Sequence, residues 1–494
     1  MRTKLAIAIS FAIASSQALA AGNTRFDEFV PMPASVTPAV AFGLEATAGM
    51  TLAAPSGTHQ FNFKSIADGA TQDSQPANGV DSGNWDMIDT NRTGPDAGRY
   101  LFMPFETGAA GVLRIDTQDV NPLTRSVTIV APGTQGFVAG DASHWTPWGS
   151  YLTAEESWGA NSTKGHLFEV TNPTTAGVNG GNMVARSIVP RVSHEGLAFD
   201  NANSLYFVDE LNGGSLYKYV SVNPTASVGS NGLTGFFDAG QTFALKVGAG
   251  GNNEGNAGAA ITGASTWVAI TDLNGAALAG ISVLAADGTI DGRLTADVAG
   301  IAATGYNRPE DIELQTLSGG DQLLYFATTD VDNGPVGNLG DGRVYNLNLT
   351  TGVVGLFADA NTINLATGLA LGNQFKNPDN IAIDADGNMY IVEDRNGGVD
   401  DDIWMAKDLN KDGDLLDVGE GLARWASNGV AGSEFTGLYF DVFNGDRAYV
   451  NIQHPNSGVD RTFEINAVPV PAALPLLASA LGGLGVASRR RKSK

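Results

Sequence analysis

The sequence predicts an all-β protein folded as a single β-propeller, and three observations favour this class. One phrase recurs along the chain, in which an acidic residue opens an alternating strand, a polar turn follows, and a second strand ends in a carboxylate. The turns are rich in Asn, Asp and Gly, as hairpin connections require. The chain has 63 glycines and 43% hydrophobic residues but few helix-like stretches. Repeated strand pairs of varying length are typical of propeller blades, and their intervals accommodate about six blades, which predicts a six-bladed propeller with long inserted loops.

The clearest copies of the phrase are HEGLAFDNANSLYFVDE, PEDIELQTLSGGDQLLYFATTD and PDNIAIDADGNMYIVED, which begin at His194, Pro309 and Pro378. A looser copy starts at Phe435 and has Thr436 in the acidic position. Earlier relatives are GRYLFMPFETG and TPWGSYLTAEES. The Gly-rich stretch 246–263 reads as a long inserted loop rather than a domain boundary.

Three opening acids of the phrase, Glu195, Glu310 and Asp379, occupy matching positions. Corresponding positions of successive blades converge on one axial channel, so these side chains are expected to point into the same space. Carboxylates brought together repel one another, and a bound polyvalent cation is the usual resolution. The alternative is that each acid caps a turn or accepts backbone N–H groups.

The chain starts with Arg2, Lys4, an apolar stretch and the small residues Ala18 and Ala20, a pattern that predicts a secretory signal peptide over residues 1–21. We assign residues 22–467 to the propeller domain.

The last segment, 468–494, has a proline-containing entry, an uncharged run shorter than the roughly 20 residues of a membrane span, and a terminal Arg/Lys cluster. It resembles the PEP-CTERM sorting signal of Gram-negative bacteria. That resemblance implies transient membrane anchoring, processing by an exosortase, and delivery to the outer surface or extracellular matrix. A plain C-terminal anchor is the alternative.

Composition excludes several functions. The chain has 52 acidic and 28 basic residues, a net charge of −24, and both end segments carry basic charges only. An acidic surface repels phosphate backbones, so no nucleic-acid partner is expected, whereas it suits cation binding. With no cysteine, the chain has neither disulfides nor thiolate ligands. No serine-hydrolase elbow, zinc-protease motif or phosphate-binding P-loop is present.

A second acidic segment, DLNKDGDLLDVGE, is similar to the first half of an EF-hand loop. It predicts a secondary calcium site, with a solvated acidic turn as the alternative; the candidate ligands are Asp408, Asn410, Asp412, Asp414 and Glu420. Two histidines, His144 and His194, lie near the repeated phrases. Each could act as an acid or orient a metal ligand, and each could equally be a packed core residue.

Six phrases in one order resemble the PhoX family of secreted alkaline phosphatases: FMPFETG, TPWGSYLTAEES, HEGLAFD, YNRPEDIEL, FKNPDNIAID and VNIQHP. The resemblance spans residues 85–456 and implies a six-bladed propeller with an axial iron and calcium cluster that hydrolyses phosphomonoesters. By position, Glu106, Glu195 and Glu310 look like metal ligands of the family. Arg308 looks like its phosphate-contacting arginine.

One position departs from the family. The family phrase usually reads LTCEE, and its cysteine sulfur bridges the irons; here Ala154 stands in that place and no cysteine exists elsewhere. Calcium, or iron without a cysteine ligand, would then need an all-oxygen site. Its candidate ligands are Glu106, Glu155, Glu156, Glu195, Glu310 and Asp379. Otherwise catalysis has been lost and the ions only join the blades.

The resulting hypothesis is an exported, calcium-dependent phosphatase that acts on a small phosphoester, with Arg308, Glu195 and Glu310 as its catalytic group. A noncatalytic calcium-binding protein of the cell surface or exopolysaccharide matrix is the alternative. Another propeller hydrolase, such as a lactonase, is a third reading.

Overall fold

The computed structural model describes residues 24–37, 49–157, 159, 162–225, 235–329, 342–395, 401–456 and 458–469. The expected signal peptide and the expected sorting segment after Pro469 lie outside the described residues. Within the described residues, no helix is long and apolar enough to cross a membrane.

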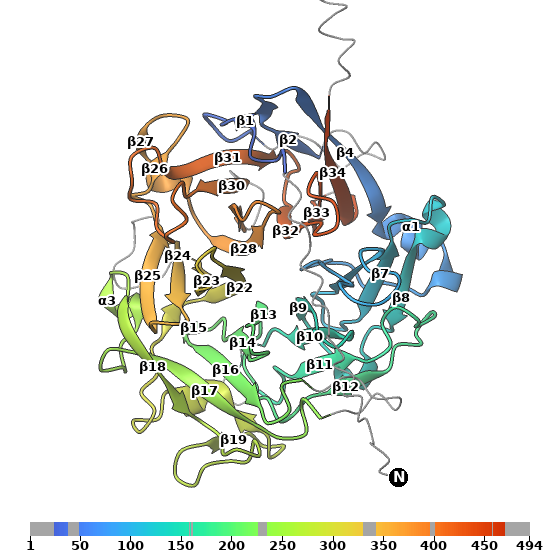
Figure 1. Cartoon of the computed structure of the whole chain (residues 1–494). Coiled ribbons are helices and arrows are strands. Elements are labelled where there is room, and N and C mark those ends of the chain that lie inside the picture. Colours follow the sequence, from blue (N-terminus) through green and yellow to red (C-terminus); the bar gives the residue numbers. More distant parts are fainter. Residues whose placement is uncertain are drawn as a thin grey trace, which may run out of the picture.

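Six four-stranded antiparallel units surround a central axis, which confirms the predicted all-β propeller (Figure 1). Blade 1 contains β5 (Asp89–Thr90), β6 (Tyr100–Pro104), β7 (Val112–Asp116) and β8 (Ser126–Val130). Blade 2 contains β9 (Gly140–Trp145), β10 (Tyr151–Glu155), β11 (Leu167–Val170) and β12 (Met183–Ala185). Blade 3 contains β13 (Leu197–Phe199), β14 (Leu205–Val208), β16 (Leu216–Ser221) and β17 (Gly240–Val247).

The second half of the ring repeats the pattern. Blade 4 contains β22 (Pro309–Thr316), β23 (Gln322–Thr328), β24 (Arg343–Asn348) and β25 (Val353–Ala358). Blade 5 contains β28 (Pro378–Ile383), β29 (Met389–Glu393), β30 (Asp402–Lys407) and β31 (Gly421–Asn428). Blade 6 contains β32 (Glu434–Phe440), β33 (Arg447–Gln453), β34 (Arg461–Pro469) and β4 (His59–Asp68). An additional strand, β18 (Gly263–Ala269), pairs with β17 and β25 and thereby joins blades 3 and 4 in one sheet.

Several short strands and helices lie outside the four-stranded blades. The remaining strands are β1 (Phe29–Val30), β2 (Met50–Leu52), β3 (Ala54–Pro55), β15 (Asn212–Gly214), β19 (Val283–Leu284), β20 (Ile290–Asp291), β21 (Tyr306–Asn307), β26 (Ile363–Asn364) and β27 (Leu369–Ala370). The helices are α1 (Gly69–Asp73), α2 (Pro122–Arg125), α3 (Glu254–Ala257) and α4 (Gly292–Ala296), with 3₁₀ turns at Pro76–Asn78, Thr134–Gly136 and Gly372–Gln374.

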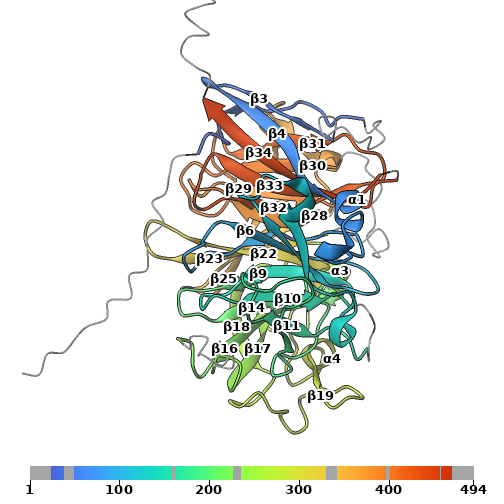
Figure 2. The same cartoon turned by 90° about the vertical axis from the view of Figure 1, so that its right-hand side faces the viewer.

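The ring is closed by two strands from opposite ends of the chain. β4 pairs antiparallel with β34, from His59 opposite Pro469 to Asp68 opposite Arg461 (Figure 2). The side chains of Phe63 and Phe463 pack edge to face across this seam, with ring centroids 5.8 Å apart. Because the chain has no cysteine, this pairing closes the ring without a covalent link.

Blades pack face to face, so their strands are apolar on both faces rather than on one. Between blades 4 and 5, for example, Tyr325, Ile391, Trp404 and Leu422 are all buried in one cluster. Burying apolar side chains between sheets is the main favourable contribution to the stability of such a fold.

The inner strands β22 and β28 carry β-bulges near the ends at which the repeated phrase begins. The strand register shifts between Pro309 and Ile312 in β22 and between Pro378 and Ile381 in β28. Residues within these bulges connect blades: Asp311 Oδ2 accepts the N–H of Ile381 at 2.9 Å. In the next blade, Asn380 Oδ1 accepts the N–H of Gly437 at 2.6 Å. Bulges change the direction in which side chains point, and here they occur at the starts of β22 and β28.

The Gly-rich stretch predicted as an inserted loop connects β17 to β18, which pair with each other. Residues 246, 247 and 263 belong to these strands, and α3 lies within the connection.

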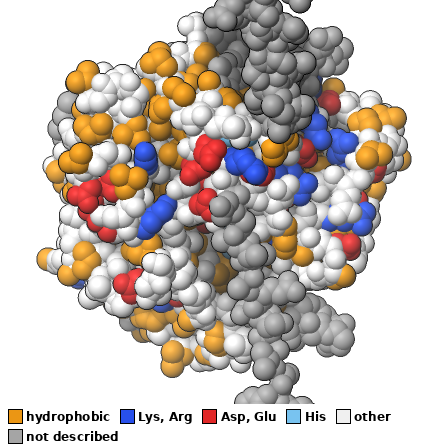
Figure 3. All heavy atoms as spheres, turned by 45° about the horizontal axis from the view of Figure 1, so that its top comes forward, with side chains coloured by type: hydrophobic (Ala, Val, Ile, Leu, Met, Phe, Trp, Pro, Cys, Tyr) orange, Lys and Arg blue, Asp and Glu red, His pale blue; other side chains and the backbone are white. Residues whose placement is uncertain are grey.

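The net charge of −24 is not concentrated in one patch on the face of the molecule shown in Figure 3. On the face in Figure 3, acidic and basic side chains lie among uncharged and apolar ones and form no continuous acidic patch on the coloured atoms. Many of the acidic residues are instead buried inside the ring.

Candidate active site

Two sets of polar residues meet at one end of the axial channel. The first set lies at the starts of the inner strands: Asp86, Asp141, Glu195, Glu310, Asp379, Glu434 and Thr436. The second set lies just after the second strand of a blade: Glu106, Glu156, Glu210, Asp394 and His454. Because neighbouring strands are antiparallel, the start of one lies beside the end of the next. With Asn84 and Arg308, these residues line one cavity of ≈ 450 Å³, called the axial cavity below.

Six of the seven residues predicted for the axial site line this cavity. Glu195, Glu310 and Asp379, the three acids in matching positions, share it as the repeat predicts. Glu106, Glu156 and Arg308 line it as well. Their placement is therefore as expected, and their roles as ligands or catalytic groups stay predictions.

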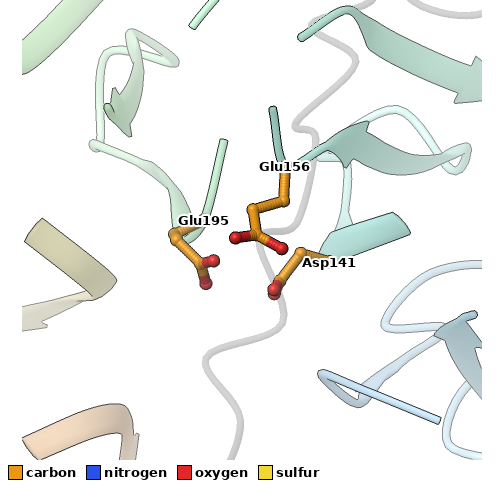
Figure 4. A group of neighbouring side chains, drawn as sticks. All are labelled: Asp141, Glu156 and Glu195. Atoms are coloured by element: carbon orange, nitrogen blue, oxygen red, sulfur yellow. The ribbon is translucent and has the colours of Figure 1, made fainter. Parts of the chain in front are cut away.

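Two groups of three carboxylates converge closely enough to share a cation. Asp141, Glu156 and Glu195 come from blades 2 and 3 and point toward one another (Figure 4). Glu195, Glu210 and Glu310 form the second group, and in each group the nearest carboxylate oxygens lie within 4.8 Å of one another. Glu195 belongs to both groups and so lies at their centre.

Of the glutamate pair at the end of β10, the structure places only Glu156 in the axial cavity. The Glu155 carboxylate is buried away from it, where it accepts N–H groups from Val138 (3.3 Å), Gly165 (2.9 Å) and His166 (3.0 Å). Successive side chains of a strand point to opposite sides, which separates the two carboxylates. The prediction that Glu155 could ligate the axial ion is therefore corrected in favour of Glu156.

Neither predicted histidine lines the axial cavity. His194 is fully buried beside Phe207, with ring centroids 5.3 Å apart, and burial lowers its pKa to about 3. His144 lies farther along β9, where its Nδ1 is 3.9 Å from Asp89 Oδ2. Burial lowers the pKa of His144 well below the usual value. Both positions favour the alternative of packed, neutral histidines.

The predicted secondary calcium loop connects β30 to β31. The Asp408 carboxylate accepts the N–H groups of Lys411 (2.6 Å) and Gly413 (3.0 Å). The Glu420 carboxylate accepts those of Leu409 (2.9 Å) and Asp417 (3.0 Å). Asp412 and Asp414 do not join them in a convergent acidic group, because the convergent acidic groups among the described residues are both axial. Asn410 donates from Nδ2 to Asp412 and Asp417, at 2.8 Å in each case. The carboxylates thus organise the turn, and calcium binding there stays a prediction.

Crowding and burial make eight of the ten axial carboxylates harder to ionise. Burial, reinforced by Asp86 and Glu156, raises the pKa of Glu106 to about 9. Burial raises the pKa of Asp86 to about 8 and that of Glu310 to about 7, although Arg308 lowers the latter. Burial also raises the pKa well above its usual value at Asp141, Glu195, Glu210, Asp379 and Glu434. A cation in the cavity would favour the charged forms.

These shifts predict that the stability of the metal-free protein falls as pH rises. A carboxyl with a raised pKa in the folded chain contributes full stability below its unfolded pKa and loses it as pH passes through its folded pKa. For Glu106 that window runs from 4.5 to about 9, and for Glu310 from 4.5 to about 7. Calorimetry with a chelator should give a lower Tm at pH 9 than at pH 5, and calcium should remove most of the difference. A chelated protein with an unchanged or higher Tm at pH 9 would contradict this.

Arg308 is the cationic side chain of the cavity that stays charged at any ordinary pH. Its Nε donates to Glu210 at 3.1 Å, and its Nη2 lies 3.3 Å from Glu310. Burial opposes its charge, yet Glu310 and Glu210 raise its pKa above the ordinary value. The planar guanidinium can bind an oxyanion through two N–H groups, and its side chain is 21% exposed.

The donor set fits a cation that prefers oxygen ligands and does not fit a thiolate-bridged iron pair. Ala154 is fully buried in an apolar cluster with Ala142, Leu152, Leu167 and Val192. Its side chain does not line the axial cavity. Carboxylate oxygens are the usual ligands of calcium, and they also suit iron without sulfur.

Six acidic or basic lining residues were not predicted from the sequence: Asp86, Asp141, Glu210, Asp394, Glu434 and His454. A signal existed for Glu210 and Asp394, because each closes a copy of the repeated phrase. The equivalent acid of the third copy, Asp330, lies outside the described residues.

Comparisons with known proteins identify a family and a solved structure that this chain resembles. The sequence profile of alkaline phosphatase PhoX matches residues 135–456. PhoX from Pseudomonas fluorescens, solved in complex with vanadate, a transition state analogue, has a TM-score of 0.58 and 16% identity, covering 89% of this chain and 98% of that one.

Other solved structures are more remote. The Fusarium graminearum α-L-arabinofuranosidase Arb93a, solved as a point mutant in complex with an iminosugar inhibitor, has a TM-score of 0.35 and 10% identity, covering 78% of this chain and 97% of that one. The extracellular domains 1–2 of Drosophila Semaphorin 1b have a TM-score of 0.30 and 10% identity, covering 86% of this chain and 88% of that one. No curated protein sequence matches. The profile match covers more than half of the chain and includes both convergent carboxylate groups, so the chain belongs to the alkaline phosphatase PhoX family.

Proposed function

We propose that this PhoX-family phosphatase hydrolyses phosphomonoesters in the axial cavity with calcium held by carboxylates alone. The observation that carries the proposal is the placement of Arg308 among ten carboxylates in a single cavity. A propeller whose acids only joined blades would have no physical need for a partly exposed arginine at that point.

Two ligand sets are available for calcium. One consists of Glu195, Glu210 and Glu310, and the other of Asp141, Glu156 and Glu195. Bound there, calcium would polarise phosphoryl oxygens and lower the pKa of a bound water. Asp379 and Glu106 lie in the same cavity and could complete either shell.

The protein's own residues would orient the substrate. Arg308 donates N–H groups that match two phosphoryl oxygens. Its partners Glu210 and Glu310 are themselves carboxylates of the second ligand set, so the arginine lies directly beside the proposed cation site. A phosphate dianion would be repelled by the ten carboxylates if they were charged and unneutralised, which makes substrate binding depend on the cations.

We also propose that the protein is exported and sorted to the cell surface or matrix of a Gram-negative bacterium. The proposal rests on the signal-like start of the chain and on the resemblance of segment 468–494 to a sorting signal. Calcium at extracellular concentrations suits weak carboxylate sites.

The test is hydrolysis of a chromogenic phosphomonoester by the purified full chain with calcium, with iron, and after chelation. Turnover that requires calcium and disappears on chelation supports the proposal. The competing function is a noncatalytic calcium-binding surface protein, which the absence of the family's cysteine at position 154 favours. Absence of turnover in every condition, with a Tm that still falls on chelation, would support that second function and reject the first.

A further inference from the structure

The backbone around Arg308 adopts a conformation that needs support. Its φ is +46°, in the left-handed region that disfavours a residue with a Cβ atom. The neighbouring residue on one side is Pro309, which cannot donate a hydrogen bond. On the other side lies Asn307, so contacts with this residue can help to fix the backbone that carries the arginine. Such conformations persist where the surrounding structure fixes them.

The Gly-rich connection between β17 and β18 contacts the segment before Arg308 directly. The N–H of Gly305 donates to the carbonyl of Asn252 at 2.9 Å, and the N–H of Glu254 donates to the carbonyl of Gly305 at 2.9 Å. The same segment also forms β21, which pairs antiparallel with β15 and places Asn212 opposite Asn307. The segment 305–307 is thus enclosed by two loops that come from blade 3 and its connection.

Glu254 is buried, with only 1% of its surface exposed, and is the most buried of the described side chains of this connection. Its Oε2 accepts the N–H of Asn307 at 3.0 Å. Its Oε1 accepts hydrogen bonds from the side chains of Arg343 and Tyr345 in β24. The carboxylate therefore joins the connection, the segment before Arg308, and the third strand of blade 4.

Hydrogen bonds fix the backbone just before Arg308 and just after it. The Asn307 N–H is bound by Glu254, and the Arg308 carbonyl accepts the N–H of Thr329 at 3.1 Å. Thr329 also donates its hydroxyl to Glu310 at 2.5 Å, which extends the network into the axial cavity. Glu254 itself does not line that cavity.

We propose that Glu254 is a positioning residue that fixes the backbone before Arg308 and so aims the guanidinium at the phosphoryl group. This inference rests on the proposed function, because it assigns Arg308 the role of binding phosphate. The inference also gives the Gly-rich connection a structural role, because this loop places one buried carboxylate beside the segment that carries the arginine. A small displacement of a binding group is enough to lower catalysis by up to roughly 100-fold.

The test compares Glu254→Ala and Glu254→Gln in the full chain with calcium. Glu254→Ala removes the acceptor of the Asn307 N–H and is expected to raise both KM and the inhibition constant of inorganic phosphate by roughly tenfold or more. Glu254→Gln keeps an oxygen for that N–H and should restore most of the affinity. The double variant Glu254→Ala/Arg308→Ala should bind phosphate no more weakly than Arg308→Ala alone, because both changes act on one interaction.

Glu169→Ala is the matched control. Glu169 is 2% exposed and ion-paired with Arg186, but it belongs to β11 and does not line the axial cavity. This variant should lower the Tm while leaving the inhibition constant of phosphate unchanged. Hydrogen exchange should show faster exchange of the Asn307 amide in Glu254→Ala and not in Glu169→Ala.

The outcomes separate the two proposals. If the wild-type chain shows no turnover and no phosphate inhibition, the proposed function fails and the inference fails with it. If the wild-type chain is active and a folded Glu254→Ala variant has unchanged KM and phosphate inhibition, only the positioning role is overturned. Equal loss of phosphate affinity in Glu169→Ala would also overturn it, because the effect would then be general destabilisation.

Discussion

Replacing Arg308 with alanine is expected to reduce phosphomonoester hydrolysis by roughly 10²–10³-fold, in line with the loss of one preorganised transition-state donor. The guanidinium donates from within a ring of carboxylates, and among the described lining residues no lysine or second arginine can replace it. Loss of its charge also removes a cationic partner of Glu210 and Glu310. The measurement is kcat/KM with calcium present, together with the Tm of the variant.

A matched control separates catalysis from folding. Arg186 is likewise ion-paired with a glutamate, Glu169, but lies away from the axial cavity. Arg186→Ala should lower the Tm and preserve kcat/KM, whereas Arg308→Lys should recover only part of the activity, because an ammonium cannot bind two oxygens in a fixed plane. Normal turnover by Arg308→Ala would refute the role of this residue.

Glu195→Gln is expected to abolish the calcium-dependent rise in Tm and to lower activity at least about 100-fold. Replacing a residue that only orients a metal ligand already lowers metal affinity or activity by roughly 10- to 100-fold. Glu195 is the carboxylate that belongs to both convergent groups. The substitution keeps the size of the side chain and removes its charge, so a loss of calcium response reports ligation rather than packing. Calcium titration by calorimetry, in parallel with turnover, measures both effects.

Glu155→Gln is the control for this prediction. Its carboxylate is as buried as that of Glu195, but it accepts backbone N–H groups outside the cavity. This variant should lose stability at every calcium concentration and keep the calcium-dependent part of its Tm. If Glu155→Gln lost the calcium response and Glu195→Gln kept it, the assignment of the ligand set would be reversed.

The repeated phrase contains enough information for the fold and for part of the site, whereas Glu106 and Arg308 are assigned from the family resemblance. The repeated phrase encodes both strands and the opening acid of a blade, so the repeat alone predicts that Glu195, Glu310 and Asp379 share one channel. The same phrase also ends in a carboxylate, and the antiparallel pairing of the two strands brings that second acid to the first. Glu210 and Asp394 could therefore have been predicted by the same reasoning.

Other site residues depend on local geometry that the pattern does not encode. Asp86 lies three residues before a two-residue strand, and Asp141 is the second residue of a strand whose sequence does not match the phrase. The distinction between Glu155 and Glu156 depends on the side to which each side chain points, and the register shift between Thr153 and Glu155 in β10 makes this hard to infer from the sequence. Two adjacent glutamates look equivalent in a sequence, yet one satisfies buried amides and the other faces the cavity.

The role inferred for Glu254 lay outside the reach of sequence patterns. It stands in a stretch dominated by glycine, asparagine and alanine, a composition that indicates a loop and gives no reason to single out one acid. Only the fold brings this residue to the segment before Arg308, and its hydrogen bond to Asn307 joins residues 53 positions apart in the chain.

The most direct test of a calcium centre built from carboxylates is the metal content of the active protein, measured with its turnover after chelation and stepwise restoration of metals. We predict that calcium alone restores full hydrolysis of a phosphomonoester and that bound iron does not correlate with activity. Activity that returns only with iron, in proportion to the iron bound, would contradict the account.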